Sequence, residues 1–348
     1  MNIAIDATEN AVDFINSNNS FLFEALKLMV NEQPANQFIL ISNTKNDLQQ
    51  LPNLIFENIK PKPAFFQKSW LTLKLSSILK KHKVDLLVSF NKSRLLFSSI
   101  PQCLIVTDTA KVKTSCLRKA KTIIVFSVFV KNMILKQLKK DTNKIEVVPA
   151  AIATQFGKIG VRRKNEVKEK YSDGKEFFLF VGAIQTEKEL IFLLKSFSQF
   201  KKRQQSNLQL LIVGGKNQKF DKNLESYKYR KEVKWISDID ENELASITIA
   251  AYAALQPFGA SYLPALQAMQ SAVPVIAIAK SVVQEIAKEA ALFIDAETSA
   301  ALAEKMMLIY TNENLRMQLV EKGKIIAAEF NIEQTATQLA HSIIKAVN

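Results

Sequence analysis

Short apolar runs alternate with longer amphipathic segments along almost the whole chain, and this alternation limits the folds that the chain can adopt. Runs such as FILIS at residues 38–42 and FFLFV at residues 177–181 have the length and apolar content of buried strands. Segments between such runs, for example residues 68–81, space their apolar residues as an amphipathic helix does. Strands that alternate with helices form βαβ units, so the sequence predicts parallel sheets covered by helices.

The same pattern assigns most of the chain to individual elements. The expected strands cover residues 2–6, 37–42, 85–89, 103–107, 122–126, 144–148, 177–181, 209–213, 233–236, 251–255 and 275–277. The expected helices cover residues 20–31, 68–81, 190–204, 262–269, 299–311, 313–329 and 332–347.

The length of the chain indicates two domains. A chain of 348 residues is long for one domain, and its apolar share of 48% allows a core in each half. Pro149 closes the first series of strands, and the polar, charged stretch 157–174 predicts a linker or a helix between the domains. We therefore expect two Rossmann-like lobes that face a cleft.

Positive charge is concentrated in the first half of the chain. The formal net charge is +14, and residues 60–144 contain 19 basic residues against three acidic ones, Asp85, Asp108 and Asp141. Such an excess predicts an acidic partner or surface. The basic helix at residues 68–83 has an apolar stripe, which is typical of a crossover helix packed on a sheet.

Several classes of site and location are not supported by the sequence. Two cysteines (Cys103, Cys116) and two histidines at scattered positions form no zinc pattern, so we expect no metal and two free thiols in a reducing compartment. The N-terminal residues MNIAIDA predict a strand rather than a signal peptide. No apolar run reaches the length of a membrane-spanning helix.

Residues 255–295 contain the most informative motif, which reads LQPFGASYLPALQAMQSAVPVIAIAKSVVQEIAKEAALFID. The pairs at 263–264 (Leu-Pro) and 268–269 (Ala-Met) and the triplet at 273–275 (Val-Pro-Val) match the donor-binding motif of family-4 glycosyltransferases. The chain therefore resembles these retaining enzymes of the GT-B fold. On this alignment the two signature glutamates, eight residues apart, fall on Gly259 and Gln267, so both carboxylates are absent.

The resemblance extends over most of the chain and implies its architecture. FFLFVGAIQTEK (177–188), LQLLIVGG (208–215) and NENLRMQLVEKG (312–323) follow the family in the same order. The implied fold is α/β of the GT-B type. Residues 1–155 would form an acceptor-side lobe and residues 156–330 a nucleotide-sugar lobe. Residues 331–348 would form a C-terminal helix that crosses back to the first lobe.

The resemblance also implies donor-binding positions around Gly182 and Gly214. Lys188 matches a family lysine that neutralises the donor diphosphate, whereas the accompanying arginine is replaced by Ala183. The pyrophosphate would lie against the N-terminus of the helix that follows Gly259, Ala260 and Ser261. Gln267 still offers hydrogen bonds to the ribose but lacks the stronger charge-assisted bond of a carboxylate.

The first lobe departs from the family too. ATENAVDFINSNNS replaces a glycine-rich turn after the first strand, and a Cβ at such a turn blocks the close approach of backbone to a ligand. The family's His-Asp pair is Thr107-Asp108, and only about a dozen residues follow before the next strand. The family's Asn-Gly near residue 150 is Ala150-Ala151.

Ordinary structural roles compete with these functional interpretations. Lys188 lies at a solvated helix start, which explains a lone lysine as well as phosphate contact does. The pair Gly214-Gly215 is typical of a strand-end turn, and Glu285 and Asp295 suit capping or surface roles.

Two functions from different classes remain open on the sequence alone. The first is a glycosyltransferase-family protein of weak or lost activity, which by resemblance takes a nucleotide sugar as donor, without metal or other cofactor, and transfers its hexose to a glycan or a lipid-linked glycan. The second is a non-catalytic binding or scaffold protein that partners an active glycosyltransferase or an anionic membrane. No nucleic-acid motif is present, so we expect no nucleic-acid partner. The expected location is cytoplasmic, peripheral on the inner membrane face.

Overall fold

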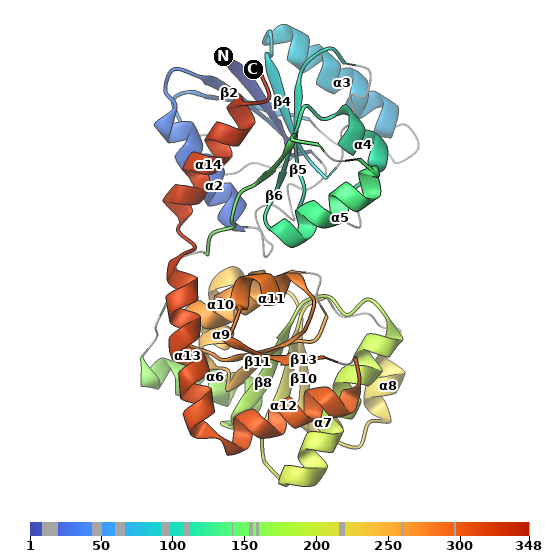
Figure 1. Cartoon of the computed structure of the whole chain (residues 1–348), viewed down its shortest axis with the longest axis vertical. Helices are drawn as coiled ribbons and strands as arrows, with labels where there is room; N and C mark the ends of the chain where they lie inside the picture. Colours follow the sequence, from blue (N-terminus) through green and yellow to red (C-terminus); the bar gives the residue numbers. More distant parts are fainter. Residues whose placement is uncertain are drawn as a thin grey trace. The chain divides into compact units, whose positions relative to one another are not determined.

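The structure is a computed structural model, in which the chain forms two compact units. It describes residues 1–8, 20–43, 51–59, 67–91, 98–107, 112–140, 142–152, 156–157, 160–215, 220–258, 261–295 and 297–347. Unit 1 consists of Met1–Ala151 with Phe330–Asn348, and unit 2 consists of Ile152–Glu329. Each unit is built around one parallel sheet (Figure 1).

Unit 1 contains a seven-stranded sheet in the order β3-β2-β1-β4-β5-β6-β7, in which every neighbouring pair is parallel. Its elements are β1 (Asn2–Asp6), α2 (Ser20–Glu32), β2 (Gln37–Ser42), β3 (Leu54–Asn58), α3 (Gln67–Lys81), β4 (Leu86–Phe90), β5 (Gln102–Ile105), α4 (Thr114–Lys119), β6 (Thr122–Val125), α5 (Val128–Leu138), β7 (Ile145–Val147) and α14 (Ile332–Ile344).

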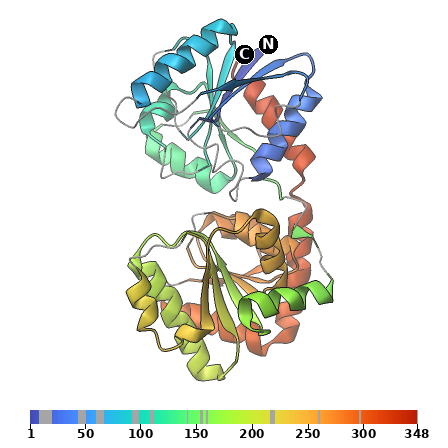
Figure 2. The same cartoon turned by 180° about the vertical axis from the view of Figure 1, so that it is seen from behind.

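The strand register determines which helices share a face of this sheet. Ala4 lies beside Leu87, Leu104 lies beside Ile123, and Ile123 lies beside Ile145. On this face α3 packs against the residues of β1 and β4, and α4 and α5 pack against those of β5, β6 and β7. The helices α2 and α14 pack against each other on the opposite face (Figures 1 and 2). The two chain termini consequently lie side by side at this unit.

Unit 2 contains a six-stranded parallel sheet in the order β10-β9-β8-β11-β12-β13. Its elements are α6 (Val161–Ser172), β8 (Phe177–Val181), α7 (Glu187–Gln204), β9 (Gln209–Val213), α8 (Asp221–Glu225), a 3-10 turn (Arg230–Glu232), β10 (Val233–Ile236), α9 (Glu241–Ala250), β11 (Ala253–Gln256), α10 (Leu263–Gln270), β12 (Val275–Ile278), α11 (Val282–Ala287), β13 (Ala291–Ile294), α12 (Ser299–Thr311) and α13 (Glu313–Ala328).

The core of unit 2 lies between the sheet and the helices α7 and α12. Phe197 and Phe200 of α7 are fully buried, and Phe200 meets Phe178 of β8 edge-to-face at a centroid distance of 5.0 Å. Large aromatic side chains of this kind bury much apolar area and fix the helix on the sheet. On the other side, α13 packs on α10, where Gly323 allows close approach because its missing Cβ would lie 3.1 Å from Cγ of Met269.

The prediction of two parallel-sheet, Rossmann-like lobes is confirmed. The strand pattern missed β3 and β13, which are edge strands of the two sheets. Both are partly exposed. β3 ends in Glu57 and Asn58 and so lacks the continuous apolar run of a buried strand, whereas β13 is apolar throughout but has only four residues, and so short a run cannot be distinguished from a buried helix segment by its pattern. The short helices α4 and α11 and the longer α5 and α9 were also not predicted. Among the described helices, none has both the length and the apolar content needed to cross a membrane.

Candidate functional site

The strand order of unit 2 places a topological switch point between β8 and β11. These two strands are hydrogen-bonded neighbours. The chain leaves β8 toward β9 and β10 but leaves β11 toward β12 and β13, on the other side of the sheet. The chain therefore leads away from these adjacent strand ends to opposite sides of the switch point. Open parallel sheets bind ligands at the carboxyl ends of strands where the loops separate in this way.

Two glycines set the loops that follow β8 and β9. Gly182 has a φ of +149° and Gly214 a φ of +154°, and a Cβ on Gly214 would lie 2.2 Å from the carbonyl oxygen of Gly182. The N–H of Gly214 donates to the carbonyl of Ile236 at 3.0 Å, and its own carbonyl accepts from Nε1 of Trp235 at 3.0 Å. Since its N–H is already engaged, the geometry favours a turn role for Gly214 over a phosphate cradle.

The loop after β8 leads into the N-terminus of α7, where Lys188 is exposed. Thr186 caps the helix, and the Glu189 carboxylate accepts from the N–H groups of Gln185 (2.7 Å) and Thr186 (3.1 Å). This reciprocal arrangement is a capping box, which satisfies N–H groups that the helix leaves unpaired. Glu187 adds a second carboxylate to the same turn. Lys188 therefore lies between two acidic residues rather than in a cluster of cations.

The loop after β11 is anchored at its start. Gln256 is 3% exposed, and its Nε2 donates to the carbonyl of Val181 at 3.4 Å, which joins the ends of β11 and β8. The Phe258 ring packs edge-to-face on Phe180 and Phe192, each at a centroid distance of 5.7 Å. These contacts fix the backbone up to residue 258. Residues 259 and 260, Gly and Ala, lie outside the described residues.

The helix α10 follows directly on this loop. Oγ of Ser261 accepts from the N–H of Leu263 at 3.3 Å, and Pro264 occupies the first turn, where a missing N–H costs nothing. Gln267 lies on the next turn and is only 5% exposed. A glutamate there would bring a charge into an almost fully buried position, whereas the amide present is neutral.

A second polar group lies at the carboxyl edge of the sheet of unit 1. Asp6 and Ser89 are register partners on β1 and β4, and Oδ1 of Asp6 accepts from the hydroxyl of Thr8 at 2.7 Å. Ser89 is 1% exposed, and its hydroxyl has no hydrogen-bond partner among the residues that the structure describes. Asn91 follows β4, where its Nδ2 donates to Oγ1 of Thr107 at 2.6 Å and its Oδ1 accepts from the N–H of Thr107 at 2.8 Å.

Asn91 thus holds Thr107 by two hydrogen bonds, and it is one of three polar residues at this sheet edge that the sequence pattern did not reveal. Asp6, Ser89 and Asn91 each lie at or just after the end of a strand on neighbouring β1 and β4. A search for polar residues at the ends of predicted strands would have found them, since parallel strands end at one edge of a sheet. Asp108, predicted beside Thr107, lies outside the described residues.

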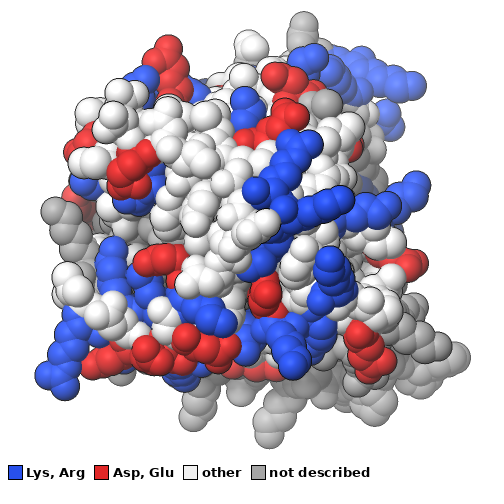
Figure 3. All heavy atoms as spheres, turned by 90° about the horizontal axis from the view of Figure 1, so that it is seen from below, with Lys and Arg blue, Asp and Glu red and all other residues white. Residues whose placement is uncertain are grey.

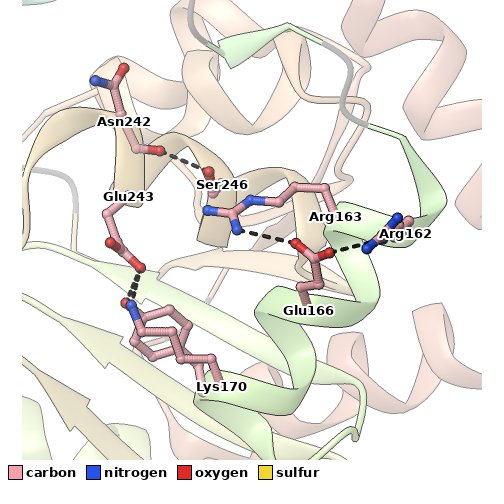
Figure 4. Close-up of polar contacts among 8 residues, drawn as sticks. Arg162, Arg163, Glu166, Lys170, Asn242, Glu243 and Ser246 are labelled. Carbon is pink, nitrogen blue, oxygen red and sulfur yellow. Dashed lines mark hydrogen bonds and ion pairs between the residues drawn. The ribbon is translucent and has the colours of Figure 1, made fainter.

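A third polar network joins α6 to α9 (Figure 4). Nζ of Lys170 lies 2.6 Å from a Glu243 carboxylate oxygen that also accepts from the Tyr171 hydroxyl. These bonds, that of Lys170 first, lower the pKa of Glu243. Arg162 pairs with Glu166 one turn along α6, and an open hollow of about 860 Å³ follows this helix. Among the described residues, only α6 lines this hollow, so no second element helps to form a binding site there. We therefore interpret the polar network as a structural link between α6 and α9.

The described ranges contain no group of three His, Cys, Asp or Glu side chains arranged to hold a metal ion. Cys103 and Cys116 are both buried, and neither forms a disulfide bond within the described residues. Burial raises the pKa of the Cys103 thiol, which disfavours the reactive thiolate.

Comparison with known proteins assigns a family to much of unit 2. Residues 161–325 match the family described as glycosyl transferases group 1. The alpha-1,3/1,6-mannosyltransferase ALG2 of Saccharomyces cerevisiae is 27% identical over 130 residues, which cover 37% of this chain and 25% of ALG2. The match thus spans about a quarter of that relative. Unit 2 accordingly carries a glycosyltransferase group 1 domain.

Solved structures extend the likeness in fold to the whole chain. WaaG, a glycosyltransferase involved in lipopolysaccharide biosynthesis, has a TM-score of 0.77 at 15% identity, covering 98% of this chain and 99% of WaaG. Anabaena Alr3699/HepE in complex with UDP and glucose has a TM-score of 0.76 at 12% identity, covering 99% of both chains. At such identities the likeness shows the fold, which is that of GT-B glycosyltransferases.

Proposed function

We propose that this chain is a divergent member of the retaining family-4 glycosyltransferases whose hexosyl transfer from a nucleotide sugar is weak or lost. The observation that carries the proposal is Gln267, which occupies the position of a signature glutamate and lies 5% exposed in α10, next to the switch point of the sheet. The neutral amide forgoes the charge-assisted bond to a ribose that a carboxylate would make. Gly259 likewise supplies no side chain at the other signature position.

The surroundings of Lys188 support weak donor binding. A diphosphate is stabilised by converging cations and by free N–H groups at a helix N-terminus. Here Ala183 stands where the family carries arginine, and the Glu189 carboxylate already accepts the N–H groups of Gln185 and Thr186. Lys188 would then be the main cation available to a diphosphate on this side of the switch point.

Two proteins of similar fold support the class of ligand and the biosynthetic role that we propose. One structural neighbour holds UDP and glucose, and another is involved in lipopolysaccharide biosynthesis. We therefore propose a nucleotide sugar as the donor of unit 2, an acceptor held by unit 1 near Asp6, Asn91 and Thr107, and a role in polysaccharide biosynthesis. The proposed location is cytoplasmic, at the inner face of a membrane.

A second candidate function is a non-catalytic partner of an active glycosyltransferase. The observation that favours it is the combined absence of both signature carboxylates and of the arginine at Ala183. A protein of this kind keeps the fold and gives up the donor, because fold and activity are separable properties.

Titration calorimetry with UDP-glucose and GDP-mannose tests the proposal. Loss of a charge-assisted ribose bond costs about 1–3 kcal/mol, or up to roughly two decades in affinity, so we expect millimolar binding at best. Lys188→Gln should abolish the residual binding, whereas Lys195→Gln, an exposed lysine further along α7, should leave it unchanged. Micromolar binding with brisk transfer would refute the proposal. Complete absence of binding would favour the non-catalytic partner.

A further inference from the structure

The two faces of the sheet in unit 1 are covered by helices of opposite charge. On one face, α3, α4 and α5 together carry eight basic and no acidic residues. On the other face, α2 and α14 carry one basic and three acidic residues. The positive charge of the first half of the chain is therefore concentrated on one side of one sheet. We call the outward side of α3, α4 and α5, with the residues that directly flank these helices, the basic face.

The flanking residues increase the charge of the basic face further. Residues 67–83 and 112–140 contain 13 basic and no acidic residues. Eleven of the basic side chains are exposed, namely Lys74, Lys80, Lys81, Lys83, Lys113, Arg118, Lys119, Lys121, Lys136, Lys139 and Lys140. Of these, within the described residues, only Lys81 forms an ion pair, with Glu57 at 2.7 Å. By contrast, Figure 3 shows a side of the molecule on which basic and acidic side chains are interspersed.

Exposed apolar side chains lie among these lysines. Leu73 of α3 is 72% exposed, and Val128 and Met133 of α5 are 50% and 44% exposed. The inward sides of the same helices are well packed, for example Leu75 at 1% and Ile134 at 1%. The outward apolar residues are thus not needed for the core, and α3 and α5 each present apolar and basic groups together to solvent.

We infer that the basic face docks on an anionic phospholipid membrane. Lysines near an acidic lipid surface each add attraction, and apolar side chains between them gain by entering the interfacial region. Nucleic acid offers negative charge but no apolar layer for Leu73, Val128 and Met133. In addition, 12 of the 13 basic residues are lysines, whereas arginine is the residue that recognises phosphate through paired hydrogen bonds.

This inference deepens the proposed membrane location, but it does not depend on donor binding by unit 2. Its test is therefore vesicle binding without any nucleotide. The full chain would be mixed with vesicles of phosphatidylcholine containing about one third phosphatidylserine, and with pure phosphatidylcholine vesicles. We expect binding to the acidic vesicles alone, and a steep loss of binding as salt shortens the screening length to about 8 Å at physiological ionic strength.

Matched variants locate the contact. Lys74, Lys121 and Lys136 are exposed, lie on or beside three different helices of the basic face and form no ion pair with another described residue, so their change to Gln should leave the fold intact. We expect the triple variant to bind acidic vesicles roughly a hundredfold more weakly. The control variant removes equal charge from exposed positions of unit 2, Lys195, Lys202 and Lys231, and should bind as the unaltered chain does.

A third variant separates a membrane from nucleic acid. Leu73→Ser, Val128→Ser and Met133→Ser together should lower vesicle binding about tenfold, because interfacial insertion rewards apolar area, and should leave binding to duplex RNA unchanged. Thermal melting of each variant confirms that it is folded. Failure to bind acidic vesicles at low salt would overturn the inference, as would equal losses in the two lysine variants. Tighter binding to RNA than to vesicles, insensitive to the serine changes, would also overturn it and assign the face to nucleic acid.

Discussion

Replacement of Gly214 by alanine should destabilise unit 2 strongly, because two separate constraints act on this residue. Its φ of +154° is a conformation that residues with a side chain rarely adopt, which costs about 1–3 kcal/mol. The added Cβ would lie 2.2 Å from the carbonyl oxygen of Gly182, and relief of such an overlap costs about another 1–3 kcal/mol. We expect a loss of about 4 kcal/mol in the free energy of unfolding.

The adjacent Gly215 provides the control. A Cβ there would meet no atom within 4 Å, and its φ does not lie in the range that excludes side chains. Gly215→Ala should therefore change the free energy of unfolding by about 0.5 kcal/mol or less, as surface substitutions usually do. The two variants differ by one position in sequence and by one methyl group in the same turn.

The two tryptophans make the assay specific for one unit. Trp70 lies in unit 1 and Trp235 in unit 2, where Trp235 donates to the carbonyl of Gly214 itself. In a Trp70→Phe background, fluorescence reports unfolding of unit 2 alone. For a domain of this size, 4 kcal/mol corresponds to a fall of roughly 8–16 °C in Tm. Equal thermal unfolding midpoints for Gly214→Ala and Gly215→Ala would refute the close packing of the loops after β8 and β9.

Three further predictions concern the carboxylate of Glu57, the half-buried amine of Lys144 and the donor motif. Hydrogen bonds from Lys81 first, and then from His82, lower the pKa of Glu57 in the folded state. The stability that this carboxylate contributes is therefore present above its unfolded pKa near 4.5 and is lost as the pH falls below that value. Glu57→Gln should make the denaturation midpoint depend less on pH in the acid range, and an unchanged acid dependence would contradict this prediction. Nζ of Lys144 donates to three carbonyl oxygens at the end of α4 at 2.7–3.0 Å. Lys144→Met should therefore lower the free energy of unfolding, measured in urea, by about 2–3 kcal/mol. An unchanged free energy of unfolding would show that water replaces the amine. Gly259→Glu with Gln267→Glu should not restore sugar transfer in a turnover assay, because the missing arginine and the altered first lobe misplace the reactants; brisk turnover would show that unit 1 is competent.

The composition and spacing of the sequence determined the class of fold. Runs such as Phe177–Val181 and Val275–Ile278 are buried on both sides, and a strand buried in this way is apolar throughout its length. That signal is local, so it can be recognised without knowledge of strand order. Edge strands such as Leu54–Asn58 need only one partner and remain partly exposed, so the same signal is too weak to reveal them.

The candidate site was predicted from the sequence only where its residues are close together in the chain. Lys188 and Gln267 were found through motifs, but their surroundings were not, because Glu189 and the buried setting of α10 matter only once the helices are packed. Asp6 and Ser89 lie far apart in the chain and become neighbours through the pairing of β1 with β4. No local pattern contains that pairing.

The sequence by itself determined that the first half of this protein is strongly basic and that both halves form parallel sheets. Only the tertiary structure decided that α3, α4 and α5 gather this charge on one face, while α2 and α14 cover the other. The reason is that a helix joining two parallel strands packs on the face set by the order of those strands and by the right-handed crossover. Strand order is a property of contacts between distant segments, so the position of the charge was not determined until those segments had paired.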